Sequence, residues 1–235
     1  MTLFSDQSSD PLPAGSSPTA VAEPTGGRVR TAGEQLLEQA DALARGPLPA
    51  TAVPVYGTLL AAEPGQVEAR LHLAALLERL DEPGEAIVVL SDGLKLTPDQ
   101  TEFLVLRGGI QGRLRRYPDA EADLRRALRL HPSHAPAHFE LAHLLWRKGL
   151  IADSALHFRR SLEFQPDNPR THYYLGEALN QAGDLAGARS SVARALELDP
   201  QDAKAHQLLG RILDRLGLPE EAREMYRRGR ELAES

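Results

Sequence analysis

The sequence predicts an all-α solenoid, a fold in which short helical hairpins stack on one another along the chain. Three observations lead to this prediction: a proline recurs every 34 residues, a leucine-rich segment precedes each of these prolines, and apolar residues stand at helical spacing between them. The recurring prolines are Pro64, Pro98, Pro132, Pro166 and Pro200. Because one hairpin is too small to bury both of its faces, its stability must come from stacking on its neighbours.

The N-terminal segment, residues 1–32, is rich in serine, proline, threonine and glycine and has few large apolar side chains. Such a composition cannot bury enough surface to offset the entropy lost on ordering. We therefore expect a disordered tail here, which could serve as a tether or as a short recognition segment.

Beyond this tail, the period divides the chain into six units of one hairpin each. The fifth unit is the clearest: Leu175, Ala178 and Leu179 lie at i, i+3 and i+4 on one face of a first helix, and a second apolar series runs from Ala188 to Leu196. Gly183 suits the left-handed C-terminal cap of the first helix. Asn168 and Asp202 suit the N-caps of the first helices that follow each proline. The expected units are 33–66, 67–100, 101–134, 135–168, 169–202 and 203–235.

A set of small and large residues keeps the same phase in successive units. Small residues recur every 34 residues at Ala52, Ala86, Ala120, Ser154, Ala188 and Ala222. Counted from Pro169, positions 4, 7, 8, 20, 24, 27 and 32 hold His172, Leu175, Gly176, Ala188, Val192, Ala195 and Pro200. Counted from Ala203, the same positions up to 27 hold His206, Leu209, Gly210, Ala222, Tyr226 and Gly229. This pattern resembles the tetratricopeptide repeat family, and the resemblance covers residues 33–235.

Two units depart from the pattern of that family. The first unit has Gln39 where leucine is expected and carries Pro47, Pro49 and Pro54, so we expect its second helix to be short. The third unit has Arg107 at the leucine position. Its first helix also contains Gly108, Gly109 and Gly112, which either open room for a ligand or are tolerated weaknesses in the helix.

The resemblance implies a right-handed superhelix whose first helices line a concave, peptide-binding or protein-binding surface at positions 2, 5, 6, 9, 12 and 13 of each unit. In the fourth to sixth units these positions bring together aromatic anchors and polar contacts, since aromatic side chains are enriched at binding hot spots. The alternative is that Trp146 and Tyr174 pack as core between units. The candidate peptide-binding residues are Phe139, His143, Trp146, Arg147, Arg170, Tyr173, Tyr174, Glu177, Asn180 and Arg211.

Charges along the same surface change from acidic to basic. The first two units offer Glu34, Glu38, Asp41, Glu68 and Glu78 against Arg45 and Arg79, and the last two offer Arg170, Lys204, Arg211 and Arg215 against Glu177 and Asp214. A ligand with a basic end toward the N-terminal units and an acidic end toward the C-terminal ones would complement this gradient. The lysine and asparagine of the chaperone-binding carboxylate clamp are not matched at positions 5 and 9, so we do not expect recognition of chaperone C-termini.

The composition excludes several classes of function. The chain of 235 residues has no cysteine, so disulfides, thiolate metal sites and cysteine nucleophiles are absent. A net charge of −6 argues against general nucleic-acid binding. No segment approaches the roughly 18 apolar residues of a membrane span, and no secretory signal is evident, so we expect no membrane insertion and a cytoplasmic location. No nucleophile elbow, phosphate loop or H-E-x-x-H motif occurs, so we expect no enzymatic activity and no cofactor.

The leading functional hypothesis is therefore a non-catalytic adaptor that binds an extended peptide or a partner protein in the concave groove. A first alternative is a regulatory or scaffold subunit of an enzyme or envelope-assembly complex that works through the convex face, with Arg125, Arg126 and Arg129 in contact. A second alternative is metal binding by histidines such as His134 and His138, although no third ligand is evident and no metal site is predicted. The partner and the oligomeric state cannot be derived from a repeat architecture alone.

Overall fold

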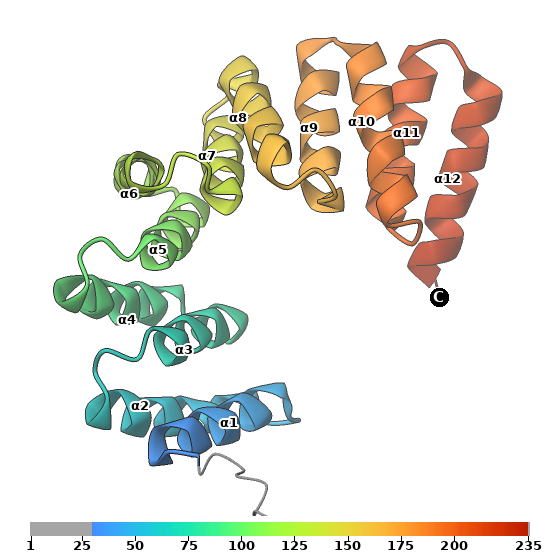
Figure 1. Ribbon diagram of the computed structural model, residues 1–235. Helices are drawn as coiled ribbons and strands as arrows, with labels where there is room; N and C mark the ends of the chain where they lie inside the picture. The colour runs from blue at the N-terminus through green and yellow to red at the C-terminus, as the bar shows by residue number, and fades with distance from the viewer. Residues whose placement is uncertain (1–29, 235) are drawn as a thin grey trace, which may run out of the picture. The chain divides into compact units, whose positions relative to one another are not determined.

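Helical hairpins follow one another from residue 32 onward in the computed structural model, which describes residues 30–234 (Figure 1). Within these residues there are twelve α-helices, one short 3-10 helix and no strand. The predicted tail therefore lies outside the described residues except for its last three positions. The helices are α1 (Ala32–Arg45), η1 (Pro49–Thr51), α2 (Ala52–Ala62), α3 (Val67–Arg79), α4 (Pro83–Leu96), α5 (Thr101–Arg113), α6 (Tyr117–Leu130), α7 (Ala135–Arg147), α8 (Ile151–Phe164), α9 (Pro169–Ala182), α10 (Leu185–Leu198), α11 (Ala203–Arg215) and α12 (Pro219–Glu234).

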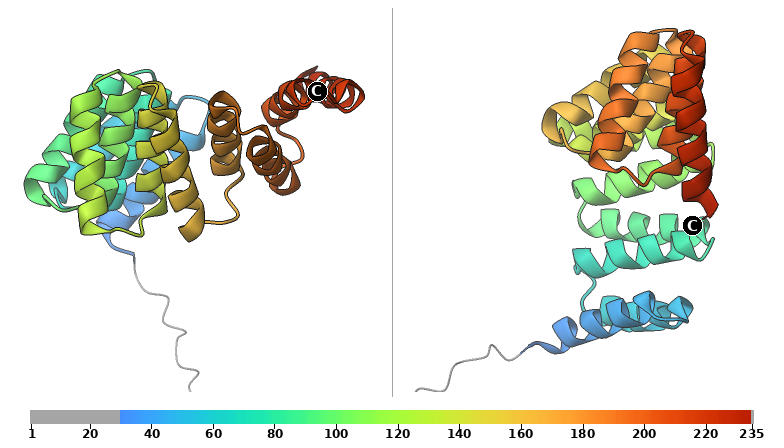
Figure 2. Two further views of the ribbon diagram at one scale, coloured as in Figure 1. Left: turned by 90° about the horizontal axis from the view of Figure 1, so that it is seen from above. Right: turned by 90° about the vertical axis from the view of Figure 1, so that its right-hand side faces the viewer.

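The helices pair as the 34-residue period predicts. Each odd-numbered helix packs against the even-numbered helix that follows it, and each hairpin packs against the next (Figures 1 and 2). The odd-numbered helices also contact one another from α1 to α11 in an unbroken series. We call these the first helices, and the surface that they share is the first-helix face. The predicted all-α solenoid of six hairpins is confirmed.

The residues predicted to begin and end the helices do so by the expected contacts. The Asn168 side chain accepts a hydrogen bond from the Thr171 N–H at 3.0 Å, and the Asp202 side chain accepts from Lys204 and Ala205. Gly183 ends α9 with φ of +86°, the left-handed conformation that glycine adopts without strain.

The same turn recurs in the second, third, fourth and sixth units, but the second and third lack the glycine. Gly149 and Gly217 have φ of +78° and +74°. Asp81 and Arg115, which stand 34 residues apart in the corresponding turns, are forced to φ of +61°. A residue with a Cβ atom is disfavoured in this conformation, so these two turns carry local strain.

The first unit is irregular, as its prolines predict. The 3-10 helix at Pro49–Thr51 takes the place of the first turn of its second helix. Helix α2 has 11 residues, compared with 14 in α4, α6, α8 and α10. The prediction of a short second helix is confirmed.

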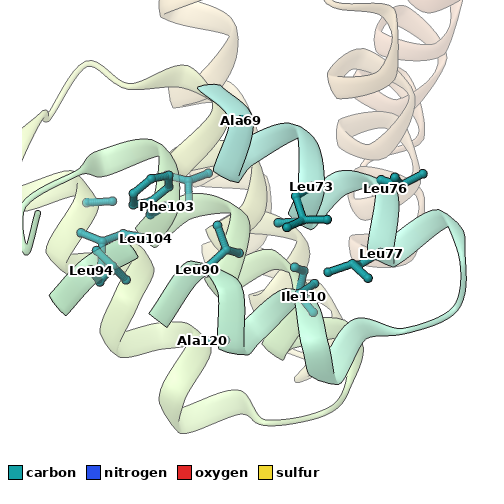
Figure 3. Close-up of a cluster of buried hydrophobic side chains, with 14 of the residues drawn as sticks. Ala69, Leu73, Leu76, Leu77, Leu90, Leu94, Phe103, Leu104, Ile110 and Ala120 are labelled. Carbon is teal, nitrogen blue, oxygen red and sulfur yellow. The ribbon is translucent and has the colours of Figure 1, made fainter. Parts of the chain in front are cut away.

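The hydrophobic core continues from one hairpin to the next and is not confined to any single hairpin. One cluster joins α1 to α7, and Figure 3 shows part of it, where Leu73, Leu77 and Leu90 lie beside Phe103 and Ile110 from the next unit. A second cluster joins α7 to α11. Burial of apolar surface across every boundary couples each unit to its neighbours.

The recurring small residues mark the closest approach of the two helices in a hairpin. Each has an exposed fraction of 0%: Ala52, Ala86, Ala120, Ser154, Ala188 and Ala222. In the third and fifth units a glycine of the first helix stands opposite: a Cβ atom on Gly108 would lie 3.2 Å from the Ala120 carbonyl oxygen, and one on Gly176 would lie 3.2 Å from that of Ala188. Larger side chains at either position would push the two helices apart.

Arg107, which departs from the pattern of the other units, is held by an ion pair inside the third hairpin. Its Nε and Nη2 atoms donate to the two carboxylate oxygens of Asp123 at 2.7 and 2.8 Å, and its Nη1 donates to the Ser91 hydroxyl at 2.9 Å. Only 20% of the Arg107 side chain and 11% of the Asp123 side chain are exposed. A paired, hydrogen-bonded arginine thus takes the place of the expected leucine.

Candidate functional site

A cavity with an apolar floor lies on the first-helix face between α5, α7 and the start of α9. It has a volume of about 380 Å³ and we call it the central cavity. Its apolar floor is formed by Val105, Leu106 and Phe139, and charged side chains stand at its rim. The lining residues are Glu102, Val105, Leu106, Gly109, Arg113, His134, Pro136, Phe139, Glu140, Ser161, Gln165, Asn168 and Arg170.

The central cavity exists because the third unit has no side chain at Gly109. A Cβ atom there would lie 2.9 Å from Glu140 Oε2, so the glycine leaves room for the Glu140 side chain to lie against α5. Burial raises the pKa of Glu140, while Arg113 and Arg170 act in the opposite direction. Arg113 Nη1 is 4.0 Å from the same Oε2 atom. The half-buried carboxyl group of Glu140 thus sits beside an apolar floor, with the cationic groups of Arg113 and Arg170 near it.

Six of the candidate residues form one connected group of side chains on α7 and α9. The Tyr174 ring is central to it, with ring centroids 5.8 Å from Phe139, 5.0 Å from His143 and 6.5 Å from Trp146. Tyr173 packs on Tyr174 at 5.2 Å, and the Arg170 guanidinium lies 4.6 Å from the centre of the Phe139 ring. We call this group, together with Phe158, the aromatic cluster.

The aromatic cluster serves as core between the fourth and fifth units. Phe158, on α8, has an exposed fraction of 0% and stacks on Tyr174 at 6.0 Å. Phe139 is 7% exposed, and the Trp146, Tyr173 and Tyr174 side chains are half-buried against the same core. Most of the surface of Trp146 and Tyr174 therefore packs between the two units, as the alternative interpretation states. Their exposed edges lie on the first-helix face.

Burial changes the ionisation of two members of this cluster. Desolvation, with Arg147, Arg170 and Arg113 nearby, lowers the pKa of His143 to about 4, so this imidazole is neutral near pH 7. Desolvation and the Glu177 carboxylate raise the pKa of Tyr173 to about 12. Both rings are thus uncharged surfaces at neutral pH.

The other four candidate residues lie around the cluster and are not drawn into it. Asn180 is engaged by the next unit, because Arg215 Nη1 donates to its backbone carbonyl at 2.5 Å and also to its side-chain oxygen. Arg147 and Glu177 are half-buried, and Arg211 is exposed on α11. Among the described residues, none of these last three forms an ion pair.

The central cavity lies mostly in the third and fourth units, whereas the candidate residues come from the fourth, fifth and sixth units. Of the ten candidates, only Phe139 and Arg170 line the central cavity. Val105, Leu106 and Arg113 were missed, although they occupy the same positions, 5, 6 and 13, that selected residues in the later units. Applying those positions to the third unit as well would have found them.

The acidic end of the predicted charge gradient is partly neutralised by its own neighbours. Asp41 Oδ1 accepts hydrogen bonds from the buried Tyr56 hydroxyl at 2.5 Å and from His72 Nδ1 at 2.8 Å. Glu78 pairs with Arg113 of the next unit. Burial, followed by the bond to Asp41, raises the pKa of Tyr56. Asp41 and Glu78 are therefore already paired within the protein.

The histidines considered as metal ligands have structural partners. His138 Nε2 bonds to the Pro132 carbonyl at 2.9 Å, and His172 and His206 make the same bond to the proline six residues earlier at 2.8 and 3.1 Å. His134 Nδ1 caps α7 by accepting from Ala137, and His138 Nδ1 meets His157 at 3.1 Å. Within the described part of the chain, no group of three or more histidine, aspartate or glutamate side chains could hold a metal ion.

Comparison with known proteins identifies the class of repeat. Two family models, both described as tetratricopeptide repeat, match residues 107–169 and residues 48–108 and 179–234. Together they span most of the chain, and the chain belongs to the tetratricopeptide repeat family. No curated protein matches the sequence.

Solved structures of the same fold include three useful references. PilW, a type IV pilus biogenesis factor, has a TM-score of 0.74 at 22% identity, covering 84% of this chain and 91% of its own. MamA from Desulfovibrio magneticus RS-1 gives 0.62 at 23% identity, covering 71% and 94%. YrrB, a tetratricopeptide repeat protein with an unusual peptide-binding site, gives 0.58 at 19% identity, covering 75% and 91%. At these identities the likeness shows the fold alone. No helix of residues 30–234 is long and apolar enough to cross a membrane.

Proposed function

We propose that this protein is a non-catalytic adaptor that binds an extended peptide segment of a partner protein along the first-helix face. The observation that carries this proposal is the central cavity, whose apolar floor opens between charged side chains. One apolar side chain of the peptide would fill it, and full burial of a side chain of leucine size contributes about 2 kcal/mol. The family and the printed description of YrrB, which has a peptide-binding site, support the same kind of ligand.

The candidate residues divide into two roles in this proposal. Phe139 and Arg170 line the central cavity and would contact the peptide directly. His143, Trp146 and Tyr174 would mainly hold the fourth and fifth units together and offer ring edges. The peptide would continue past Tyr173 over α9 and α11, where Arg147, Glu177, Asn180 and Arg211 provide polar contacts.

The convex face is the weaker candidate, because two of its three named arginines already have partners. Arg125 pairs with Glu121 at 2.6 Å, and Arg126 pairs with Asp99 at 2.8 Å. A partner on that side would have to break these contacts or leave them unused. The first-helix face, in contrast, offers a cavity and cationic side chains without ion pairs.

The test is a selection of peptides from a random displayed library on the full chain, followed by fluorescence anisotropy with the selected peptides. Gly109→Leu places a side chain in the central cavity, and Gly84→Leu is the matched control, since a Cβ atom on exposed Gly84 meets nothing within 4 Å. We expect Gly109→Leu to weaken binding about tenfold or more, which corresponds to losing one buried apolar side chain, while Gly84→Leu leaves it unchanged. Equal binding by both variants, with their circular dichroism unchanged, would refute the proposal.

A further inference from the structure

A row of arginines runs along one edge of the first-helix face. Five of the six first helices end on an arginine, and we call these five residues the arginine row. They are Arg45, Arg79, Arg113, Arg147 and Arg215, and Gln181 stands at the equivalent place in α9. A cation is favoured at the negative end of the helix dipole, but this preference would act on the second helices too. Helices α2, α8, α10 and α12 have no basic residue in their last turn.

Three of the five side chains of the row, those of Arg79, Arg113 and Arg215, are held in place by the preceding unit. Arg79 Nη2 donates to the Ala44 carbonyl at 3.4 Å, and Arg215 Nη1 donates to the Asn180 carbonyl at 2.5 Å. Arg113 pairs with Glu78, which stands at the same place in its helix as Ala44 and Asn180. A guanidinium has five N–H donors, so one such bond positions the group and leaves donors for a ligand. Side chains ordered in advance lose less entropy on binding.

The row keeps positive charge that nearby carboxylates do not cancel. Among the described residues, Arg45, Arg79 and Arg147 form no ion pair with a carboxylate. Asp41, which lines the same cavity as Arg45 and Arg79, is bonded to Tyr56 and His72 and forms no ion pair with either arginine. The chain as a whole has a net charge of −6, so this cationic edge runs against its overall charge.

A second cavity lies at the N-terminal part of the row. It has a volume of about 210 Å³ and is lined by Asp41, Ala44, Arg45, Tyr56, His72, Ala75, Leu76 and Arg79. The bond from His72 Nδ1 to Asp41 fixes the ring, and 41% of the His72 side chain is exposed. A carboxylate entering this cavity would stand between the guanidinium groups of Arg45 and Arg79, whose N–H donors match the two oxygens of a carboxylate.

We infer that the arginine row binds an acidic peptide segment, with one glutamate or aspartate side chain seated between Arg45 and Arg79. This inference rests on the proposed function and names the chemistry of its ligand. Separate carboxylates suit the row better than a nucleic acid does. The carboxylates of Asp41, Glu78 and Glu140, interspersed along the same face, would repel a dense line of phosphates.

The test uses three fluorescein-labelled synthetic peptides of about twelve residues, which alternate leucine with glutamate, glutamine or lysine. Anisotropy titrations with the full chain compare Arg45→Gln/Arg79→Gln with a matched control, Arg129→Gln/Arg159→Gln, whose arginines are exposed on second helices. We expect the glutamate peptide to bind about tenfold more tightly than the glutamine peptide. The row variant should remove most of this difference in affinity, and the control variant should change it less than about twofold. The wild-type chain should bind the glutamate peptide more weakly at about 300 mM salt.

Equal affinities for the glutamate and glutamine peptides, or equal loss in the control variant, would overturn the inference. Because Arg79 also bonds to Ala44, the single variant Arg45→Gln, which breaks no such bond, is measured alongside and is expected to weaken glutamate binding about threefold. If both peptides bind alike and Gly109→Leu weakens both, the proposed function stands and this inference falls. If Gly109→Leu changes no titration, the proposed function itself falls.

Discussion

Alanine substitutions at the three glycines of α5 should change the free energy of unfolding in different directions. A glycine inside a helix costs roughly 1 kcal/mol relative to alanine, so helix propensity alone predicts the same gain at each position. The packing differs. A Cβ atom on Gly112 would lie 3.5 Å from Leu144 Cδ1, an ordinary contact, but one on Gly108 would lie 2.8 Å from Leu124 Cγ and 3.2 Å from the Ala120 carbonyl oxygen.

The magnitudes follow from these contacts. Gly112→Ala should raise the free energy of unfolding by about 1 kcal/mol, because nothing opposes the gain in propensity. Gly108→Ala should lower it by about 1 kcal/mol, since forcing a methyl group against packed side chain and backbone costs about 2 kcal/mol. Gly109→Ala should lie between them, because the Glu140 carboxylate that it displaces is the flexible end of a side chain.

The assay is urea denaturation followed by circular dichroism, with the midpoint compared at constant slope. A difference of 1 kcal/mol should also move the thermal midpoint by roughly 2–4 °C in a chain of this size. If Gly108→Ala stabilises the protein as much as Gly112→Ala does, the close approach of α5 and α6 does not limit the side chain there. The packing argument would then be wrong.

Three further predictions concern single interactions. The pKa of His143 is lowered to about 4 from 6.5, so the free energy of unfolding should fall by up to about 3 kcal/mol as the pH falls from 6.5 to 4. The variant His143→Gln should remove this part of the pH dependence of the urea midpoint. Arg107→Leu should cost about 3 kcal/mol by leaving Asp123 buried without a partner, and Arg107→Leu/Asp123→Leu should cost less than the sum of the single changes in a double-mutant cycle. Arg115→Gly should raise the thermal midpoint by an amount equivalent to about 1 kcal/mol, because φ of +61° suits glycine; an unchanged midpoint would show that the turn is not strained.

Features that recur every 34 residues could be predicted from the sequence. Asn168, Asp202 and Gly183 were assigned as caps because each helix must satisfy its terminal backbone groups, and a period shows where the termini fall. The histidine bonds to proline carbonyls were within reach as well. In the fourth, fifth and sixth units a histidine stands six residues after the recurring proline, as His172 does after Pro166. Only the fold shows that the imidazole returns to the carbonyl of that proline.

Features that depend on one unit could not be predicted in the same way. Arg107 looked like a defect at a leucine position, since its partner Asp123 lies on the other helix of the hairpin and no other unit has that pair. The glycines of the third unit left open whether they make room for a ligand, and only the structure shows that a cavity lies at Gly109. The Trp146 and Tyr174 rings were found by that search, and the fold uses most of their surface as core.

The difference between recurring and single features also bears on how the first-helix face would select a ligand. The arginine row repeats from unit to unit, so a carboxylate can pair at several equivalent places, and the row alone would not fix the position of a peptide along the face. Gly109 stands where the other units carry Asp41, Ala75, His143, Glu177 and Arg211, and the cavity that it opens occurs in one unit. If both surfaces bind the same peptide, the row determines its affinity and salt dependence, whereas one apolar side chain in the central cavity determines its register. Moving a single leucine along an otherwise acidic peptide should then change the affinity of the peptide for the wild-type chain and leave its affinity for Gly109→Leu unchanged.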